Sequence, residues 1–501
     1  MSATAAQTNP GSSLKLWIWV GLAVIVGLMG ASFQGFWMDE ASAANIARQA
    51  NLPNWWDKLI NNHGSDTQMP LYMLYLWGWV KMAGHSEFAC RAGNVPWLLL
   101  GMLTWPRRQV GYLLALLLSP FLWFYLNESR PYIMQIGSGL LLAGATVRLA
   151  DMANQTTPVA AASRLKWTWL FCAGLVALSG SSLLGMIWAG AVPLILIGVL
   201  GIRSFLAWLK QGWLPFALSL LLCAGLAGYY FWTLGRGDRA TPGNSDIKNV
   251  LFVAYELCGF SGFGPGRNAL HGAGLAAFQG YFILSLAAFA VMLGTVLILS
   301  GRDVASRLPR RIWLVLGVTL GGATAFLLAM GVYRHFSVLG RHFAPLSVAV
   351  ALLFGTCLQC LLTRGGFRRG VALAFVGFVL VSCLSLRFCE RHLKDDYRDA
   401  AQLARAANTT GHRVWWCADT STGLYYQVPL HLAQQGQPAA GEVWAIPHPT
   451  QKQLTNSPLP DVVFLSKPEL HDPHGFMQNF LAQNGFHCTN TLPAFGIWGR
   501  P

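Results

Sequence analysis

Long apolar runs separated by short basic segments dominate this sequence, and they constrain its fold more than any other feature. Hydrophobic residues make up 54% of the 501 residues, whereas charged residues make up only 11%. A soluble globular protein carries about a quarter charged residues. A helix of about 20 apolar residues is long enough to cross the hydrocarbon core of a bilayer. The sequence therefore predicts a polytopic α-helical membrane protein.

Eleven apolar runs are candidate membrane spans. Their boundaries are soft, because several runs are short for a hydrocarbon core of roughly 30 Å. A further run, Pro70–Ala83, begins at a proline, contains Lys81 and is also short. We interpret it as a helix that lies along or dips into the outer interface. The candidate spans are residues 16–36, 92–106, 110–126, 133–150, 167–181, 183–201, 213–234, 272–299, 312–332, 344–363 and 370–388.

The distribution of Lys and Arg sets the orientation, because cytoplasmic loops carry an excess of these residues. With Pro70–Ala83 outside the bilayer, the basic clusters between spans, such as Arg107-Arg108 and 302–311, all fall on one side. This predicts a cytoplasmic N-terminus and an outer C-terminal segment. The net charge of +15 then reflects topology and anionic lipid, not nucleic-acid binding.

The composition divides the chain into three expected parts. Residues 1–13 are polar and are expected to form a disordered cytoplasmic N-terminus. Residues 14–389 are expected to form the transmembrane domain, with an outer loop at residues 37–91. Residues 390–501 are expected to form a small outer α/β domain, because strand-like and helical runs alternate there. The expected strands are 413–417, 461–465 and 496–499, and the expected helix is 477–482.

Asp39 and Glu40 stand where the first apolar run leaves the membrane. Carboxylates at such a depth are costly to keep and are candidates for function. The structural alternative is that both acids only complement the first turn of a helix that starts near Ala41.

Two other outer segments carry ionisable side chains of the same kind. Each alone is also explained by interfacial aromatic anchors and by Arg side chains that reach lipid headgroups. Together with the first loop, they predict a cavity of mixed charge on the outer face. The candidate residues are Asp39, Glu40, His63, Asp66 and Tyr72 in the first loop, Glu128, Arg130 and Tyr132 in the second, and Arg334, Arg341 and His342 in the third.

Such a cavity suits glycosyl transfer from a lipid phosphate. A hydroxyl acceptor needs a base during its attack, and a carboxylate can supply one. The leaving phosphate gains charge, which Arg or His donors can stabilise. A single displacement with one base inverts the anomeric centre.

Several motifs resemble those of GT-C glycosyltransferases of the protein mannosyltransferase and aminoarabinose transferase type (glycosyltransferase family 39). The similarity is strongest over residues 36–150, and Gln68-Met69 departs from the His-Pro that this family commonly has there. The matching segments are Trp37–Glu40, Asp66–Tyr72, Ser86–Arg91, Glu128–Tyr132, Arg341–Leu346 and Lys394–Arg398.

The resemblance implies a polyprenyl-phosphate sugar donor, a periplasmic active site in a bacterial inner membrane, and Asp39 as the base. Glu40 and Asp66 are the next candidates for that role. Arg130, Arg341 and Arg334, with His342 and Tyr72 as neighbours, are the candidates for holding the donor phosphate. His63, Glu128 and Tyr132 complete the candidate site. Metal dependence varies among such enzymes, so the resemblance assigns no cofactor and leaves a divalent metal open.

Two other functions stay open at this point. A transporter or flippase for a glycolipid predicts ionisable residues midway through spans, and the middle spans have almost none. A polymerase or ligase that uses a diphosphate-linked glycan differs only in its donor. The acceptor, whether lipid, surface glycan or protein, and the pairing of Cys417 with Cys488 are not determined by the sequence.

Overall fold

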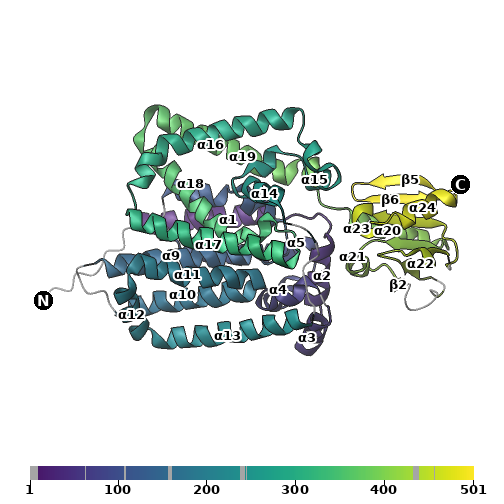
Figure 1. Cartoon of the computed structure of the whole chain (residues 1–501), viewed down its shortest axis with the longest axis horizontal. Coiled ribbons are helices and arrows are strands. Elements are labelled where there is room, and N and C mark those ends of the chain that lie inside the picture. Colours follow the sequence, from purple (N-terminus) through teal and green to yellow (C-terminus); the bar gives the residue numbers. More distant parts are fainter. Residues whose placement is uncertain are drawn as a thin grey trace.

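The structure, a computed structural model, describes residues 10–62, 64–106, 109–155, 161–236, 243, 245–432, 439, 441–455 and 457–500. Residues 1–9 of the N-terminal segment expected to be disordered lie outside the described residues, and so do His63, Arg107 and Arg108. The described residues up to 389 form a helical body, and those from 390 to 500 form a smaller domain at one end of it (Figure 1).

The first half of the body contains the elements that carry most of the candidate site. Pro120 interrupts the expected run 110–126, because proline lacks the amide hydrogen that a continuous helix needs, and it starts a new helix instead. The elements are α1 (Pro10–Gly30), α2 (Met38–Ala47), α3 (Leu52–Ile60), η1 (Ser65–Gln68), α4 (Pro70–Ala83), α5 (Glu87–Ala92), α6 (Asn94–Thr104), α7 (Val110–Leu117), α8 (Pro120–Leu126) and α9 (Tyr132–Ala153).

The second half of the body contains the longest helices. The expected run 272–299 becomes two short helices followed by α16, which begins at Tyr281. The elements are α10 (Ala161–Ser181), α11 (Leu183–Leu200), α12 (Ile202–Gln211), α13 (Trp213–Gly235), α14 (Ile247–Leu257), η2 (Phe260–Phe263), α15 (Arg267–Ala273), η3 (Gly274–Ala277), α16 (Tyr281–Ala305), α17 (Arg310–Arg334), η4 (Gly340–Phe343), α18 (Ala344–Arg364) and α19 (Gly366–Phe388).

Seven helices within the described ranges are long and apolar enough to cross a membrane, fewer than the eleven expected runs. Among the other expected runs, 92–106 corresponds to α6, which is short, and the apolar part of α1 covers only Lys15–Gly30. The seven are α9, α11, α13, α16, α17, Gly340–Arg364 and α19. The fold class is that of a polytopic α-helical membrane protein, as predicted.

Small residues let α9 approach α6 closely. A Cβ atom on Gly137 would lie 2.3 Å from the carbonyl oxygen of Trp97, and one on Gly144 would lie 2.7 Å from that of Thr104. Close backbone contact through small residues is a common way for membrane helices to pack. This contact fixes the start of α9, where Arg130 and Tyr132 lie.

Residues 390–501 contain a six-stranded sheet in the order β2-β3-β1-β4-β6-β5. The first four strands are parallel, and β6 and β5 are antiparallel to their neighbours. The consecutive residues Trp415 and Trp416 point to opposite faces, and both are buried, so helices cover the sheet on both faces. The strands are β1 (Val414–Cys417), β2 (Leu430–Leu432), β3 (Val443–Ala445), β4 (Val462–Ser466), β5 (His487–Leu492) and β6 (Phe495–Gly499).

Five helices and a short turn accompany this sheet. They are η5 (Glu390–His392), α20 (Tyr397–Thr409), α21 (Thr420–Tyr425), α22 (Gln451–Thr455), α23 (Pro468–His471) and α24 (Phe476–Gln483). The predicted α/β class of the domain, its helix near 477–482 and its three expected strands agree with these elements. Sequence analysis missed β2, β3 and β5. Cys417 and Cys488 are free thiols, the first buried and the second exposed.

Helix α21 of the small domain packs directly against α2 of the helical body (Figure 1). Asn45 Nδ2 donates to the carbonyl oxygen of Ser421 at 2.7 Å. The amide of Phe36 donates to Tyr426 Oη at 2.6 Å, and Arg398 Nη1 donates to the Phe33 carbonyl at 2.9 Å. The turn that precedes α2 is therefore held from the side of the C-terminal domain.

Candidate functional site

Asp39 and Glu40 both occupy the first turn of α2, but they face different surroundings. Acids are favourable in a first helical turn, because the free amides there carry partial positive charge. Side chains of adjacent helical residues point about 100° apart, so one acid can turn into the protein while the other faces outward. Glu40 is completely buried, whereas the Asp39 side chain is 29% exposed.

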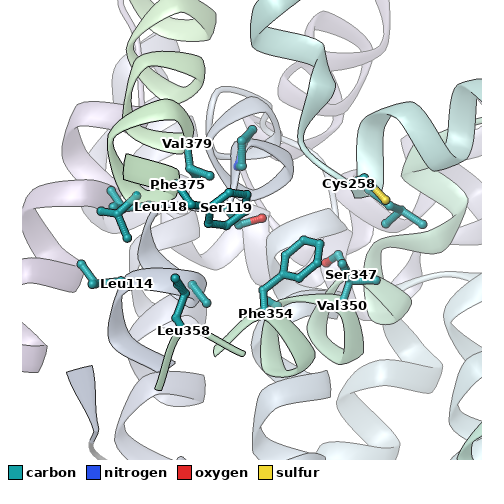
Figure 2. A pocket seen from close by; sticks show the side chains of 15 residues that line it. Leu114, Leu118, Ser119, Cys258, Ser347, Val350, Phe354, Leu358, Phe375 and Val379 are labelled. Atoms are coloured by element: carbon teal, nitrogen blue, oxygen red, sulfur yellow. The ribbon is translucent and has the colours of Figure 1, made fainter. Parts of the chain in front are cut away.

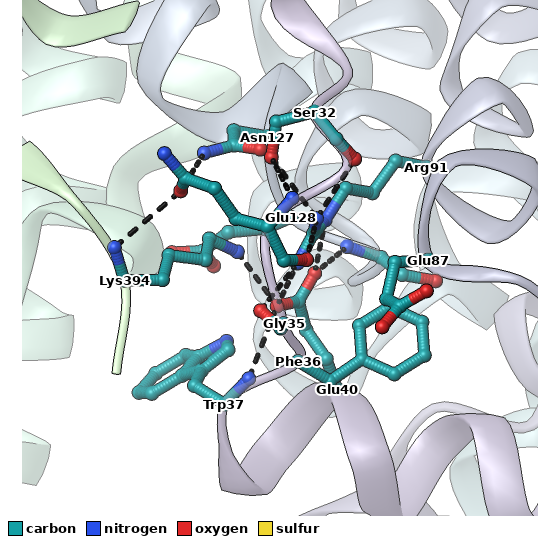
Figure 3. Close-up of polar contacts among 12 residues, drawn as sticks. Ser32, Gly35, Phe36, Trp37, Glu40, Glu87, Arg91, Asn127, Glu128 and Lys394 are labelled. Atoms are coloured by element: carbon teal, nitrogen blue, oxygen red, sulfur yellow. Dashed lines mark hydrogen bonds and ion pairs between the residues drawn. The ribbon is translucent and has the colours of Figure 1, made fainter. Parts of the chain in front are cut away.

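Glu40 is the centre of a buried network (Figure 3). Its carboxylate accepts from Arg91 at 3.0 and 2.9 Å, from Lys394 Nζ at 2.6 Å and from the amide of Ser129 at 2.8 Å. Burial alone would raise the pKa of Glu40, but Arg91 and Lys394 outweigh it and lower the pKa to about 2. Glu40 is thus a permanent carboxylate whose oxygens are already occupied.

Arg91 extends this network into the turn before α2. Its Nη1 and Nη2 atoms donate to the carbonyl oxygens of Ser32, Gln34 and Gly35 at 2.9, 2.6 and 3.1 Å. These carbonyls lie in a segment without regular structure, so they need partners from elsewhere. Arg91 therefore shapes the segment that presents Asp39.

Asp66 and Arg130 form a second buried ion pair. The other oxygen of Asp66 accepts from Ser42 Oγ at 2.6 Å and from Asn62 Nδ2 at 3.1 Å. Arg130 also donates to the Asp39 carbonyl oxygen at 3.0 Å. Burial acts to lower the pKa of Arg130, but Asp66 and Asp39 more than offset it and raise the pKa. Arg130 thereby ties η1 and α2 together as a permanent cation.

Asp39 faces Arg341, which lies in the second half of the helical body along the chain. Arg341 Nη1 lies 3.3 Å from Asp39 Oδ2, and both side chains are partly exposed, at 24% and 29%. Arg341 lies in η4, between α17 and α18. Two segments that are 302 residues apart in the chain therefore meet at an accessible acid–cation pair.

Arg267 is a site residue that the sequence analysis did not identify. Its Nη1 lies 3.3 Å from Glu128 Oε1, and its guanidinium lies 5.4 Å from the centre of the Trp37 ring. Arg341 lies 6.0 Å from the same ring, so two partly exposed cations contact one indole. Arg267 follows the Gly-rich residues 259–266, and its position between two apolar runs was the available signal.

Some buried polar atoms of the site have no hydrogen-bond partner. Among the described residues they include Trp37 Nε1, Glu128 Oε2 and Arg130 Nε. Such atoms are rare in folded proteins, because leaving one unpaired costs about 1–3 kcal/mol. These atoms are available to a polar ligand or to water.

The remaining predicted residues differ in their burial and in their contacts. Tyr72 Oη, on α4, lies 3.5 Å from Ser129 Oγ, and Tyr132 is buried against the ring of Tyr125. His342 Nδ1 accepts the amide of Leu339, so this ring nitrogen serves η4 itself. Arg334 is exposed at the end of α17. Within the described ranges, no group of three or more His, Cys, Asp or Glu could hold a metal ion.

An apolar pocket lies among α7, α18 and α19 (Figure 2). Its lining is mainly aliphatic and aromatic side chains of α7, α18 and α19. Leu257, the neighbour of Glu256, and Ser347, one turn into α18 after η4, also line it. No charged side chain is among the described residues that line it.

Comparison with known proteins places the fold. No protein-family model and no curated protein matches the sequence. The structure is similar to the crystal structure of ArnT from Cupriavidus metallidurans bound to undecaprenyl phosphate, with a TM-score of 0.52 and 14% sequence identity. The match covers 98% of each chain. The resemblance noted from the motifs is therefore confirmed at the level of the fold.

Proposed function

We propose that this chain, which shares the fold of ArnT, is an inverting glycosyltransferase. It moves a sugar from a polyprenyl-phosphate donor to a hydroxyl acceptor, with Asp39 as the general base. The observation that carries this proposal is the accessible Asp39–Arg341 pair, with Arg267 beside it. The bound undecaprenyl phosphate of the similar structure supports the class of donor.

Asp39 suits the base better than its neighbours do. A general base needs a free oxygen within hydrogen-bond reach of the acceptor proton. Glu40 is fully buried and has its oxygens occupied, and Asp66 is 3% exposed with both oxygens bonded. Asp39 combines partial exposure with a fixed main chain, because Arg130 holds its carbonyl oxygen.

Arg267 and Arg341 suit the donor phosphate. Their side chains are 29% and 24% exposed, whereas Arg130 is 2% exposed and already paired with Asp66. A guanidinium can hold a phosphate through two parallel donors. The geometry favours Arg267 and Arg341 as the clamp and gives Arg130 a positioning role.

The reaction then balances as one displacement. The acceptor oxygen bonds to the anomeric carbon as the bond from that carbon to the phosphate oxygen breaks. The acceptor proton goes to Asp39, and the electron pair of the broken bond stays on the phosphate. The phosphate changes from a diester with one negative charge to a monoester with two. Arg267 and Arg341 stabilise the added charge most in the transition state, as catalysis requires.

The proposed setting is the outer, periplasmic face of a bacterial inner membrane, with the C-terminal domain on the same side. This follows from the predicted orientation of the basic clusters. The acceptor class is a lipid, a surface glycan or a protein.

A donor panel tests the proposed function. Purified protein is incubated with polyprenyl phosphates that carry different sugars, and release of polyprenyl phosphate is measured with lipid, glycan and protein acceptors. We expect release with at least one donor. The control variant Asp57→Asn changes an exposed acid in the same loop as Asp39 and should release as much polyprenyl phosphate as wild type. No release from any donor, together with transfer from a diphosphate-linked glycan, contradicts the proposal.

A further inference from the structure

Glu256 is a buried carboxyl group beside the proposed phosphate clamp, and nothing above gives it a role. It lies in the last turn of α14 and is 6% exposed. Tyr125 Oη donates to its Oε2 atom at 3.5 Å, a long hydrogen bond. A buried carboxyl with so little hydrogen bonding is expensive to ionise unless cations face it.

The clamp segment packs directly on this carboxyl. A Cβ atom on Gly340 would lie 1.8 Å from Glu256 Oε2 and 2.8 Å from its carboxyl carbon. Residue 340 must therefore be glycine for η4 to approach Glu256 this closely. Arg341 is the next residue, so the position of Glu256 and that of the clamp are mechanically linked.

The charged groups around Glu256 are those of the donor site. Arg267 and Arg341 favour its ionised form, and Glu128 opposes it. Tyr125 from α8 and Tyr255 of its own helix also face it, and His342 of η4 is next to Arg341. Burial, the largest influence, raises the pKa of Glu256 to about 7 in spite of the two arginines.

We propose that Glu256 competes with the donor phosphate for Arg267 and Arg341, so that a phosphate binds to this site together with a proton taken up by Glu256. Ionised Glu256 partly neutralises the clamp and repels a phosphate. Protonated Glu256 leaves both cations to the ligand. This inference rests on the proposed function, because it assumes that the clamp binds a lipid phosphate.

The sign of the effect follows from linkage. A bound phosphate places a further negative charge beside Glu256 and raises its pKa, so the protonated form binds more tightly. Affinity is then highest below about pH 7 and falls as the pH rises through that value. The fall is at most about tenfold per pH unit, the limit for one linked proton.

The probe is a polyprenyl methyl phosphodiester, whose single charge does not change in this range. A polyprenyl monoester is unsuitable, because its own second ionisation near pH 6 acts in the opposite direction. The Kd is measured from about pH 5.5 to about pH 8.5 for wild type, Glu256→Gln and Glu442→Gln, an acid on the C-terminal domain that pairs with His431. Burial also raises the pKa of Asp419 and that of Asp396 to about 6, so these groups titrate in the same pH range. The test is therefore the difference in the pH dependence of the Kd between wild type and Glu256→Gln.

We expect the Kd of wild type and of Glu442→Gln to rise with pH, and that of Glu256→Gln to stay nearly constant at the low-pH value. Calorimetry of wild type in two buffers of different ionisation enthalpy should show proton uptake on binding near neutral pH, which requires no variant. Equal pH dependence in wild type and Glu256→Gln, or no proton uptake, overturns the inference and leaves the proposed function standing. Absence of phosphodiester binding at every pH overturns both.

Discussion

At the scale of single residues, the acids of the site divide by how many of their oxygens are occupied. Glu40 and Asp66 are buried and bonded by several donors, whereas Asp39 is partly exposed and faces Arg341. The arginines divide in the same way. Arg91 and Arg130 are buried and bind neighbouring segments of the fold. Arg267 and Arg341 are partly exposed, and their guanidinium groups lie at the site.

Substitution of Arg by Lys keeps the positive charge but loses the two parallel hydrogen-bond donors. Arg267→Lys and Arg341→Lys should each weaken binding of a polyprenyl phosphate by about tenfold or more, since a hydrogen bond to a charged group contributes roughly 1.5–3 kcal/mol. Thermal unfolding should change little. Lys248→Arg, on an exposed helix start, is the control. Affinities equal to wild type in both variants would place the phosphate elsewhere, and exposed Arg334 would then be tested.

Much of this site could be predicted from the sequence, because motifs place Asp39, Asp66, Arg130 and Arg341 on one face. The sequence could not show which carboxylate already has hydrogen-bond donors on both oxygens, because Arg91 and Lys394 reach Glu40 from other elements. Arg267 and Glu256 lack a motif, and only the folded chain brings Arg267 to Trp37 and Glu256 close to Arg341.

At the scale of elements, the turn before α2 is held by the network around Glu40. The fold of the C-terminal domain was predicted in class, because its strand-like and helical runs alternate. The expected spans differ more from the structure, because Pro120 and Gly280 break apolar runs that hydropathy alone joins. Hydropathy identifies apolar segments, whether they contact lipid or the protein interior, but it does not show where a helix ends.

Glu40→Gln should destabilise the protein by about 3–5 kcal/mol at neutral pH, because it leaves the buried Arg91 and Lys394 without their counter-charge. The lowered pKa of Glu40 gives this stability a pH window. The contribution is complete above the ordinary value of 4.5 and is lost as the pH falls towards about 2. Chemical unfolding of both proteins at neutral and acidic pH measures the difference. A variant that matches wild type at neutral pH would show that the network adds no stability.

At the scale of the whole molecule, the C-terminal domain and the helical body share the segment that presents Asp39. Tyr426 Oη accepts the amide of Phe36 and donates to Glu87 Oε1, and Arg398 reaches the Phe33 carbonyl. The domain therefore acts on the site through the backbone before α2.

Tyr426→Phe combined with Arg398→Ala should loosen this contact by about 1–3 kcal/mol, because the Phe36 amide is left without its partner. Turnover should fall several-fold while the Kd for a polyprenyl phosphate stays within twofold, roughly, since the clamp lies on other elements. Arg500→Ala, which removes an exposed pair with Asp461, is the control. A loss of lipid affinity equal to the loss of turnover would argue against a separate role of this contact.

The orientation of the whole molecule is a prediction from its basic clusters. A cysteine at residue 108 should be protected from an impermeant thiol reagent in intact cells, and one at Thr410 should react. The background must lack reactive native thiols, above all the exposed Cys488. Reaction of residue 108 from outside would reverse the topology and remove the argument for a periplasmic site.

The central claim is that Asp39 takes the acceptor proton in a single displacement at the anomeric carbon. The most direct measurement is single-turnover transfer by wild type and Asp39→Asn, with the configuration of the new bond determined by NMR. We predict an inverted product from wild type, and a loss of roughly 10²–10⁴-fold or more in Asp39→Asn with lipid-phosphate binding retained. Near-normal turnover of Asp39→Asn, or a product of retained configuration, would contradict the account.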